Sequence, residues 1–190
     1  HAASTLGLKA TIGVAASTCS LQDVLESDLV VLWGTNPANN QPVFMKYLYL
    51  AKKNGARIVV VNPFKEPGLE RYWVPSNIES AVFGTQMTDD WFVVHTGGDA
   101  AFVNGVLKVL LETPGAIDEE FVRTRTDGFD ALRDTLAAQS FEALEAASGA
   151  TKADMERFAS IYAGAQRAVL VWSMGITQHH CGVENVAAIV

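Results

Sequence analysis

Four short polar loops carry the residues of this chain that are best suited to binding a small molecule. Each follows a strand-like apolar run, and each contains glycine, proline or small polar residues that let a ligand approach the backbone closely. The loops are residues 34–40, 62–65, 96–99 and 173–180. The functional interpretation is a nucleotide cleft at the carboxyl ends of parallel strands. The alternative is that turn composition alone explains each loop, because all turns favour these residue types.

Asp99 is the sharpest candidate for recognising a base. A carboxylate can accept two parallel hydrogen bonds from the N1–H and N2–H₂ edge of guanine. The alternative role is an ordinary helix N-cap, which aspartate often provides. Asn62, directly after a strand, could hydrogen-bond a ribose hydroxyl, although it lacks the charge of the acidic residue usual in dinucleotide-binding folds. No G-x-G-x-x-G motif occurs, which disfavours an ordinary NAD dehydrogenase.

Histidines are the candidates for general acid–base chemistry, and the chain has four: His1, His95, His179 and His180. Their spacing reveals no serine or cysteine triad. We interpret His95 as a structural residue at a strand end. For His179 and His180, contact with a ligand and simple solvation both stay open.

Apolar runs predict the elements that position these loops. Residues 28–33 form a β-branched strand, residues 41–54 an amphipathic helix and residues 56–61 a second buried strand. This order is a βαβ unit, whose strands must be parallel. Residues 62–86 contain several prolines and glycines without sustained periodicity, so we expect a long connection there.

The rest of the chain continues the pattern. Residues 91–95 and 167–172 predict two further strands, and residues 118–163 predict helices broken near Gly128, Ser140 and Gly149. The helix after the loop at residues 96–99 has the core stripe Val103, Val106, Leu107 and Leu110. The sequence therefore predicts an α/β fold with three layers: a mostly parallel sheet with helices on both faces, in a Rossmann-like arrangement that binds a dinucleotide.

Composition narrows the class of protein. With 190 residues, a single domain over residues 1–190 is the expectation. The net charge of −7 argues against a nucleic-acid partner, and no run approaches the roughly 20 apolar residues of a membrane span. Cys19 and Cys181 form no C-x-x-C pair, so no zinc or iron–sulfur motif is present. The 49% hydrophobic content suggests spare apolar surface that lies against a partner or another domain.

The four loops in order read W-G-T-N-P, V-N-P-F-K, T-G-G-D-A-A and W-S-M-G-I-T-Q, and together they resemble the molybdopterin oxidoreductases. The likeness covers essentially the whole chain and is strongest for the formate dehydrogenase alpha-subunit group. It implies one internal domain of a larger enzyme, which grips one of two molybdopterin guanine dinucleotides. The family's guanosine and phosphate contacts carry over to Gly34, Thr35, Asn36, Pro37, Asn62, Pro63, Lys65, Gly98, Asp99, Met174, Gly175, Thr177 and Gln178.

Two departures from the family pattern concern the second loop. Many relatives have a D-P-R motif at this strand end, where this chain has Asn62 and the pair Phe64 and Lys65. Asparagine is neutral, and lysine offers a point charge instead of the planar fork of arginine. The ribose and phosphate contacts expected there are correspondingly weaker.

His1 gains most from the resemblance. The string His1-Ala2-Ala3-Ser4 with Gly7 resembles the segment that directly follows the cysteine or selenocysteine ligand of molybdenum in formate dehydrogenases. The metal ligand would then be the residue before His1, and none of these 190 residues would bind the metal. A histidine beside the metal can take the substrate proton while two electrons pass to molybdenum.

These inferences predict a cytoplasmic, molybdenum-dependent, formate-dehydrogenase-like oxidoreductase. Other segments of the same polypeptide would complete its centre, a further protein could serve as electron-transfer partner, and the isolated fragment would be inactive. The alternative from a different class is a nucleotide-binding accessory module without redox activity. A third interpretation is a purely structural interaction domain, in which the residues of every loop only form turns. The residue before His1 discriminates between these readings, because cysteine, selenocysteine or serine there favours the enzyme.

Overall fold

A computed structural model describes residues 2–75 and 77–190, which divide into two compact units. The first unit comprises the described residues up to Val93 together with residues 165–190, and the second comprises residues 94–164. A division into compact units does not decide whether each unit folds separately. The expectation of one domain over the whole chain therefore stays a prediction.

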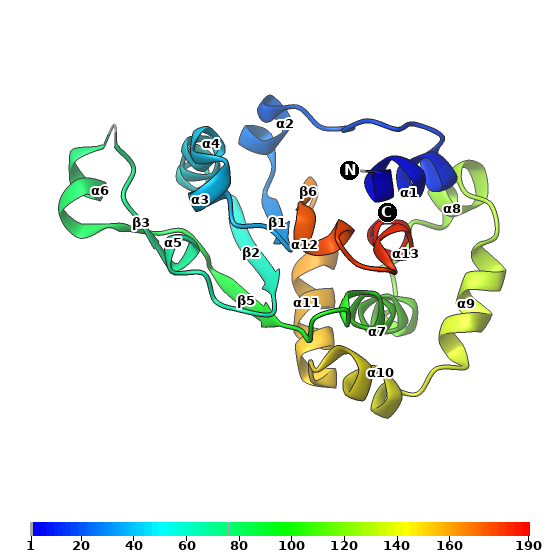
Figure 1. The fold of residues 1–190 in the computed structure, drawn as a ribbon. Coiled ribbons are helices and arrows are strands. Elements are labelled where there is room, and N and C mark those ends of the chain that lie inside the picture. Colours follow the sequence, from blue (N-terminus) through cyan, green and yellow to red (C-terminus); the bar gives the residue numbers. More distant parts are fainter. Residues whose placement is uncertain (1, 76) are drawn as a thin grey trace. The chain divides into compact units, whose positions relative to one another are not determined.

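The first unit is built on a four-stranded sheet in the order β5-β2-β1-β6 (Figure 1). Its strands are β1 (Leu29–Trp33), β2 (Arg57–Asn62), β5 (Asp90–Val93) and β6 (Ala168–Trp172). Every pair of neighbouring strands is parallel, and Trp33 of β1 is in register with Val61 of β2 and Trp172 of β6. The carboxyl ends of these three strands therefore lie side by side. The predicted α/β class with a mostly parallel sheet is confirmed.

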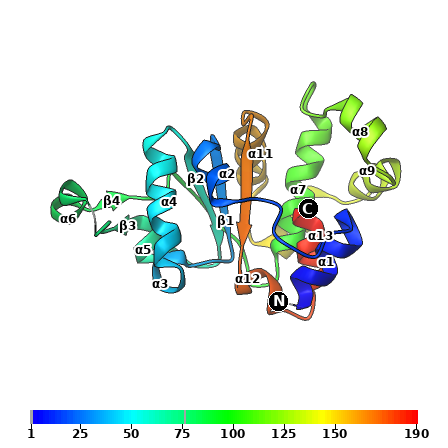
Figure 2. The same ribbon diagram turned by 90° about the horizontal axis from the view of Figure 1, so that it is seen from above.

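The strands form because their side chains are buried on both faces of the sheet, as is typical of parallel sheets. Val30 and Leu32 of β1 belong to a core cluster with Val24 of α2 (Leu21–Glu26) and Leu48 of α4 (Pro42–Lys53). Val31 points to the opposite face, because side chains alternate along a strand, and it is also fully buried. Helix α4 runs along the sheet beside β2 and β1 (Figure 2).

Five further helices of the first unit surround the sheet or its loops. They are α1 (Ala2–Ile12), α3 (Pro37–Asn40), α5 (Pro67–Glu70), α12 (Met174–Thr177) and α13 (Gly182–Ile189). Helices α1 and α13 lie side by side in both views (Figures 1 and 2). The two ends of the described chain therefore meet in one helical pair.

An arm of short elements replaces the irregular connection expected over residues 62–86. It consists of β3 (Arg71–Tyr72), α6 (Ile78–Phe83) and β4 (Thr85–Gln86), and β3 and β4 pair antiparallel. The arm extends away from the four-stranded sheet (Figures 1 and 2). A strand of two residues is too short to show an alternating pattern in the sequence. Helix α6 is stabilised locally by its N-cap, Asn77, whose side chain accepts a hydrogen bond from the amide of Ser80 at 2.8 Å.

The second unit is helical. It contains α7 (Asp99–Glu112), α8 (Glu119–Arg125), α9 (Phe129–Ala137), α10 (Phe141–Ser148) and α11 (Lys152–Ala163). The helix breaks predicted at Gly128, Ser140 and Gly149 are confirmed, since each of these residues caps a helix. The stripe on α7 packs inward, and the rings of Phe102 and Phe158 meet edge to face with centroids 5.5 Å apart.

The strand boundaries differ from the prediction by one or two residues, and the largest difference is at the end of β5. We expected a strand over residues 91–95, but β5 begins at Asp90 and ends at Val93. The amide of His95 donates to the carbonyl of Ser148 at 2.7 Å within the second unit, so it is not available to extend a sheet ladder. No helix among residues 2–75 and 77–190 is both long and apolar enough to cross a membrane.

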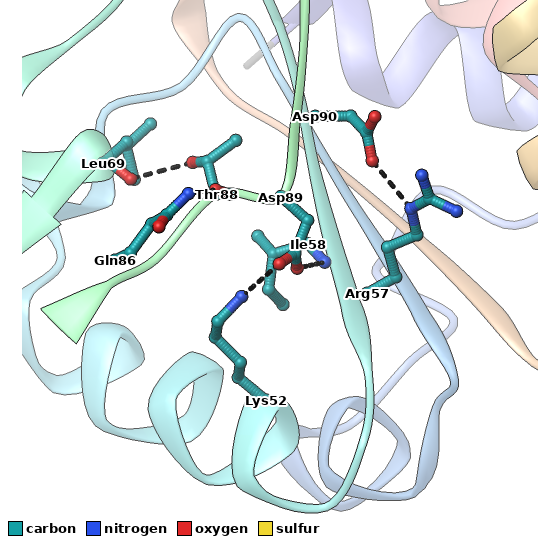
Figure 3. A network of polar contacts seen from close by, with 8 residues as sticks. All are labelled: Lys52, Arg57, Ile58, Leu69, Gln86, Thr88, Asp89 and Asp90. Carbon is teal, nitrogen blue, oxygen red and sulfur yellow. Dashed lines mark hydrogen bonds and ion pairs between the residues drawn. The ribbon is translucent and has the colours of Figure 1, made fainter.

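A polar network closes the amino-terminal edge of the sheet (Figure 3). Asp89 accepts a hydrogen bond from the amide of Ile58 at 2.8 Å and pairs with Lys52, while Asp90 pairs with Arg57 at 2.6 Å. The hydrogen bond to Asp90 raises the pKa of the Arg57 guanidinium above its ordinary value, so this pair stays charged. These contacts fix the start of β5 beside β2.

Asp28 supplies the first testable prediction. Its carboxylate accepts hydrogen bonds from the amides of Arg167 and Gln166, each at 2.9 Å, and so ties the start of β1 to the segment that leads into β6. The bond from Arg167 is the largest cause that lowers the pKa of the Asp28 carboxyl below its ordinary 3.8. We expect Asp28→Ala to reduce the free energy of unfolding by about 1 kcal/mol at neutral pH in urea titrations.

The pH dependence of this effect follows from the lowered pKa. The unfolded state binds the proton more tightly, so the stabilisation is present above the ordinary value of 3.8 and declines as the pH falls through the lowered one. The difference between wild type and Asp28→Ala should shrink on acidification. Asp127→Ala, at an exposed aspartate between α8 and α9, is the control and should have little effect at any pH. A pH-independent difference would contradict the assignment to the charged form.

Candidate functional site

A cavity of about 270 Å³ lies at the carboxyl edge of the sheet, within the first unit. It is lined by Gly34, Thr35, Asn36, Asn40, Asn62, Pro63, Phe64, Glu66, Ser173, Met174 and Gly175. These residues come from the segments that follow β1, β2 and β6. Parallel strands bring such segments together at one edge, which is where ligands bind in open α/β sheets.

Two glycines let the loops after β1 and β6 cross at the edge of this cavity. The amide of Gly175 donates to the carbonyl of Gly34 at 3.0 Å. A Cβ on Gly175 would lie 2.5 Å from that carbonyl oxygen, and a Cβ on Gly34 would lie 2.8 Å from the backbone of Gly175. Gly34 also has a φ of 57°, in the left-handed region that favours glycine. Neither position has room for a side chain.

Three buried polar atoms around the cavity have no hydrogen-bond partner among the described residues. They are Thr35 Oγ1, Asn36 Oδ1 and Asn62 Oδ1. Thr35 and Asn62 are only 3% and 5% exposed, so bulk water does not satisfy them. A buried polar group without a partner costs about 1–3 kcal/mol. Unpaired atoms at one cavity are therefore a reason to expect a ligand there.

Hydrogen bonds hold the side chains around the cavity in place. Asn62 Nδ2 donates to the carbonyl of Thr35 at 3.2 Å, which leaves Asn62 Oδ1 as the open acceptor. His179 Nε2 lies 2.7 Å from the carbonyl of Gly175, and it must donate because a carbonyl can only accept. The His179 imidazole therefore supports the loop after β6, a third role beside the two left open, and its contact with a ligand stays a prediction.

The charge around the cavity is slightly negative. Glu66 is the ionisable residue in the lining, and no lysine or arginine of the described chain is part of it. The pKa shifts resolved for Asp23, Asp28, Arg57 and Asp154 arise from contacts away from the cavity. The lining therefore suits uncharged hydrogen-bond donors, such as sugar hydroxyls, better than a phosphate.

Most of the predicted binding residues of the first unit come together. Gly34, Thr35, Asn36, Asn62, Pro63, Met174 and Gly175 line the cavity. Within the described lining, Pro37, Lys65, Thr177 and Gln178 do not appear: Pro37 is buried as the first residue of α3, and Lys65 is exposed. A cofactor longer than this cavity could still reach them, so their binding role stays a prediction. His1 lies outside the described residues.

Four lining residues were absent from the predicted binding set: Asn40, Phe64, Glu66 and Ser173. Asn40, Phe64 and Ser173 belong to loops that the sequence already marked. Glu66 carried no such signal, because an acidic residue is unexpected where the family resemblance suggested a phosphate contact. Its proximity to the cavity depends on how the chain turns into α5.

Gly98 and Asp99 lie in the second unit, at the start of α7. Gly98 is the N-cap residue and Asp99 the first helical residue, so the alternative role of Asp99 as N-cap is not the one observed. Asp99 is only 6% exposed. Its carboxylate is therefore largely shielded from bulk water.

Within the described part of the chain, the other histidines and the cysteines lie apart from the cavity. The His95 ring packs against Gly149, where a Cβ would lie 2.3 Å from it, consistent with a structural role. Cys19 and Cys181 are free thiols. Among residues 2–75 and 77–190, no group of three or more histidine, cysteine, aspartate or glutamate side chains could hold a metal ion.

A larger cavity of about 740 Å³ shares Asn40 with the smaller one. Its walls include Leu8, Val24, Phe44 and Leu170, and most of them are apolar. None of the unpaired buried polar atoms of the described chain lines it. The smaller cavity therefore has the stronger features of a specific binding site, and its unpaired acceptors and glycine crossing fit the nucleoside part of a dinucleotide cofactor.

Comparison with known proteins agrees with this geometry. Protein YdeP of Escherichia coli strain K12 is 35% identical over 201 residues, which span 100% of this chain and 26% of YdeP. Formate dehydrogenase H of the same strain is 30% identical over 189 residues, spanning 100% of this chain and 24% of that protein. The chain thus spans about a quarter of the length of these curated relatives.

A solved structure shares the fold. The acetylene hydratase from Pelobacter acetylenicus matches with a TM-score of 0.74 at 18% identity, covering 99% of this chain and 23% of that chain. A model of the family described as molybdopterin oxidoreductase matches residues 3–190. Because this match extends over nearly the whole sequence, the chain belongs to the molybdopterin oxidoreductase family.

Proposed function

We propose that this chain is the cofactor-binding part of a cytoplasmic, molybdenum-dependent, formate-dehydrogenase-like oxidoreductase. The observation that carries the proposal is the set of three unpaired, buried polar atoms around one cavity, in a chain of this family. Relatives named as formate dehydrogenases, at 27% and 30% identity, support the reaction class. When bound, a bis-molybdopterin guanine dinucleotide centre supplies two-electron transfer at molybdenum.

The residues of the chain divide the binding work by their chemistry. Asn36 and Asn62 would accept hydrogen bonds from ribose hydroxyls, and the hydroxyl of Thr35 would donate to or accept from the same nucleoside. Asp99, considered by itself in the second unit, would be the acceptor for the N1–H and N2–H₂ groups of a guanine, as the family resemblance implies. Gly34 and Gly175 would let the cofactor approach the backbone of both loops.

His1 would act on the substrate. An imidazole poised near neutral pH can hold the proton that leaves the substrate as electrons pass to the metal. The remaining domains of the same polypeptide would supply the metal ligand and the second pterin, and a separate protein could accept the electrons.

The proposal is tested by analysing the full-length protein made in a host that supplies the cofactor. We expect molybdenum together with GMP released by acid hydrolysis, and oxidation of formate with a viologen dye. His1→Gln should retain molybdenum but lose at least about a hundredfold in turnover. His95→Gln, at the imidazole packed on Gly149, is the control. Protein with neither molybdenum nor tungsten would contradict the enzyme, and guanine nucleotide binding without metal would favour the accessory module.

Thr35→Val tests the cavity directly, because the substitution is nearly isosteric and removes an unpaired hydroxyl. Without cofactor, we expect the free energy of unfolding to stay equal or rise by about 1 kcal/mol. In the loaded protein, cofactor retention should fall about fivefold, as for the loss of one hydrogen bond.

Thr88→Val is the matched control, since Thr88 is equally buried but its hydroxyl donates to the carbonyl of Leu69 at 2.8 Å. This variant should lose about 1 kcal/mol of stability and keep its cofactor. Unfolding titrations and molybdenum analysis measure both quantities. The same response from both threonines would show that the Thr35 hydroxyl has no ligand.

Asp99→Asn tests the assignment of the base. In cofactor-free full-length protein, we expect GDP to bind at least about tenfold more weakly to the variant, because one charge-assisted acceptor pair is lost. Asp118→Asn, at the exposed N-cap of α8, should bind GDP like wild type. Isothermal titration with GDP and ADP measures both. Equal affinity of the wild type for the two nucleotides would remove the guanine assignment.

A further inference from the structure

A single side-chain contact joins the last residue of β6 to the first turn of α1. Trp172 Nε1 donates to Ser4 Oγ at 3.0 Å, although the two residues are 168 positions apart. The indole N–H is a donor that cannot accept, so the direction of this bond is fixed. Trp172 is followed directly by Ser173, Met174 and Gly175, which line the cavity. Ser4 lies three positions after His1.

Helix α1 is also packed closely on α13. A Cβ on Gly7 of α1 would lie 2.7 Å from the Val186 side chain of α13. A Cβ on Gly182, at the start of α13, would lie 3.2 Å from the Ala3 side chain. The two helices therefore have little freedom to slide without a clash.

The third contact ties α13 back to the loop after β6. Asn185 of α13, which is 1% exposed, donates through Nδ2 to the carbonyl of Ile176 in α12 at 3.2 Å. The carbonyl of Thr177 lies where a Cβ on Gly182 would be, at 2.4 Å. The contacts thus form a closed circuit from β6 through α12, α13 and α1 and back to β6 through Trp172 and Ser4.

We propose that Trp172 is a positioning residue that sets the first turn of α1 relative to the loop after β6. The inference rests on the proposed function, because the position of α1 bears on the reaction only if the molybdenum centre is present. The glycine contacts restrict sliding of α1 along α13, whereas the directional bond to Ser4 fixes the amino-terminal turn of α1. The hydrogen bond adds to the packing of Ala3 at this end of the helix, where backbone N–H groups lack intrahelical partners.

The test uses the full-length, cofactor-loaded protein and two variants that break the bond from either side. Trp172→Phe keeps an aromatic ring, and Ser4→Ala keeps the helix. We expect amide hydrogen exchange in residues 2–12 to be about fivefold faster in each, as for loss of one hydrogen bond, and no faster in the double variant. The Mo(V) electron paramagnetic resonance signal should shift or broaden in each variant, while molybdenum content stays at the wild-type level.

Trp73→Phe is the control, because Trp73 lies on the exposed arm and is 62% exposed. It should match wild type in hydrogen exchange and in the Mo(V) signal. Faster exchange with an unchanged Mo(V) signal would show that the contact holds α1 without positioning the centre, and would overturn the inference. Unchanged exchange would overturn it as well. Wild-type protein without molybdenum would instead contradict the proposed function itself.

Discussion

The close approach of two backbone segments, at Gly34 and Gly175, is the constraint on which the site depends. β1 and β6 are parallel neighbours in register, so the chain leaves both strands at the same level and the two loops must pass each other. They do so with a direct backbone hydrogen bond of 3.0 Å. Any side chain at either position would push the loops apart, and with them Thr35 and Met174 on the two walls of the cavity.

The unpaired polar atoms beside this crossing destabilise the protein when no cofactor is bound. Unpaired groups such as Thr35 Oγ1 and Asn62 Oδ1 are normally avoided in protein interiors, and replacing them with apolar groups of the same shape would be neutral or favourable. They lie at one edge of the sheet, opposite the paired network of Lys52, Asp89 and Arg57, so the edge with unpaired atoms is the one where we propose that the cofactor binds. Local rules of stability are most often broken at functional sites.

Much of this arrangement could be predicted from the sequence, and the exceptions have physical reasons. Runs such as residues 28–33 are continuous and β-branched, so the buried parallel strands and the loops after them were visible locally. The crossing at Gly34 was predicted as a loop, but its partner Gly175 is 141 positions away and no local pattern joins them. Helix α1 is weakly amphipathic and is held by packing on α13, so periodicity did not reveal it. Glu66 lies at the cavity only because of the way the folded chain turns into α5, which no local pattern predicts.

Cofactor binding at this cavity is tested most directly by an experimental structure of the full-length protein with its cofactor bound. We expect a nucleoside of the cofactor in the cavity at the carboxyl ends of β1, β2 and β6, with a donor group within hydrogen-bond distance of Asn62 Oδ1. A structure in which both nucleotides of the cofactor lie elsewhere, while water or another part of the protein pairs with Asn62 and Thr35, would contradict it.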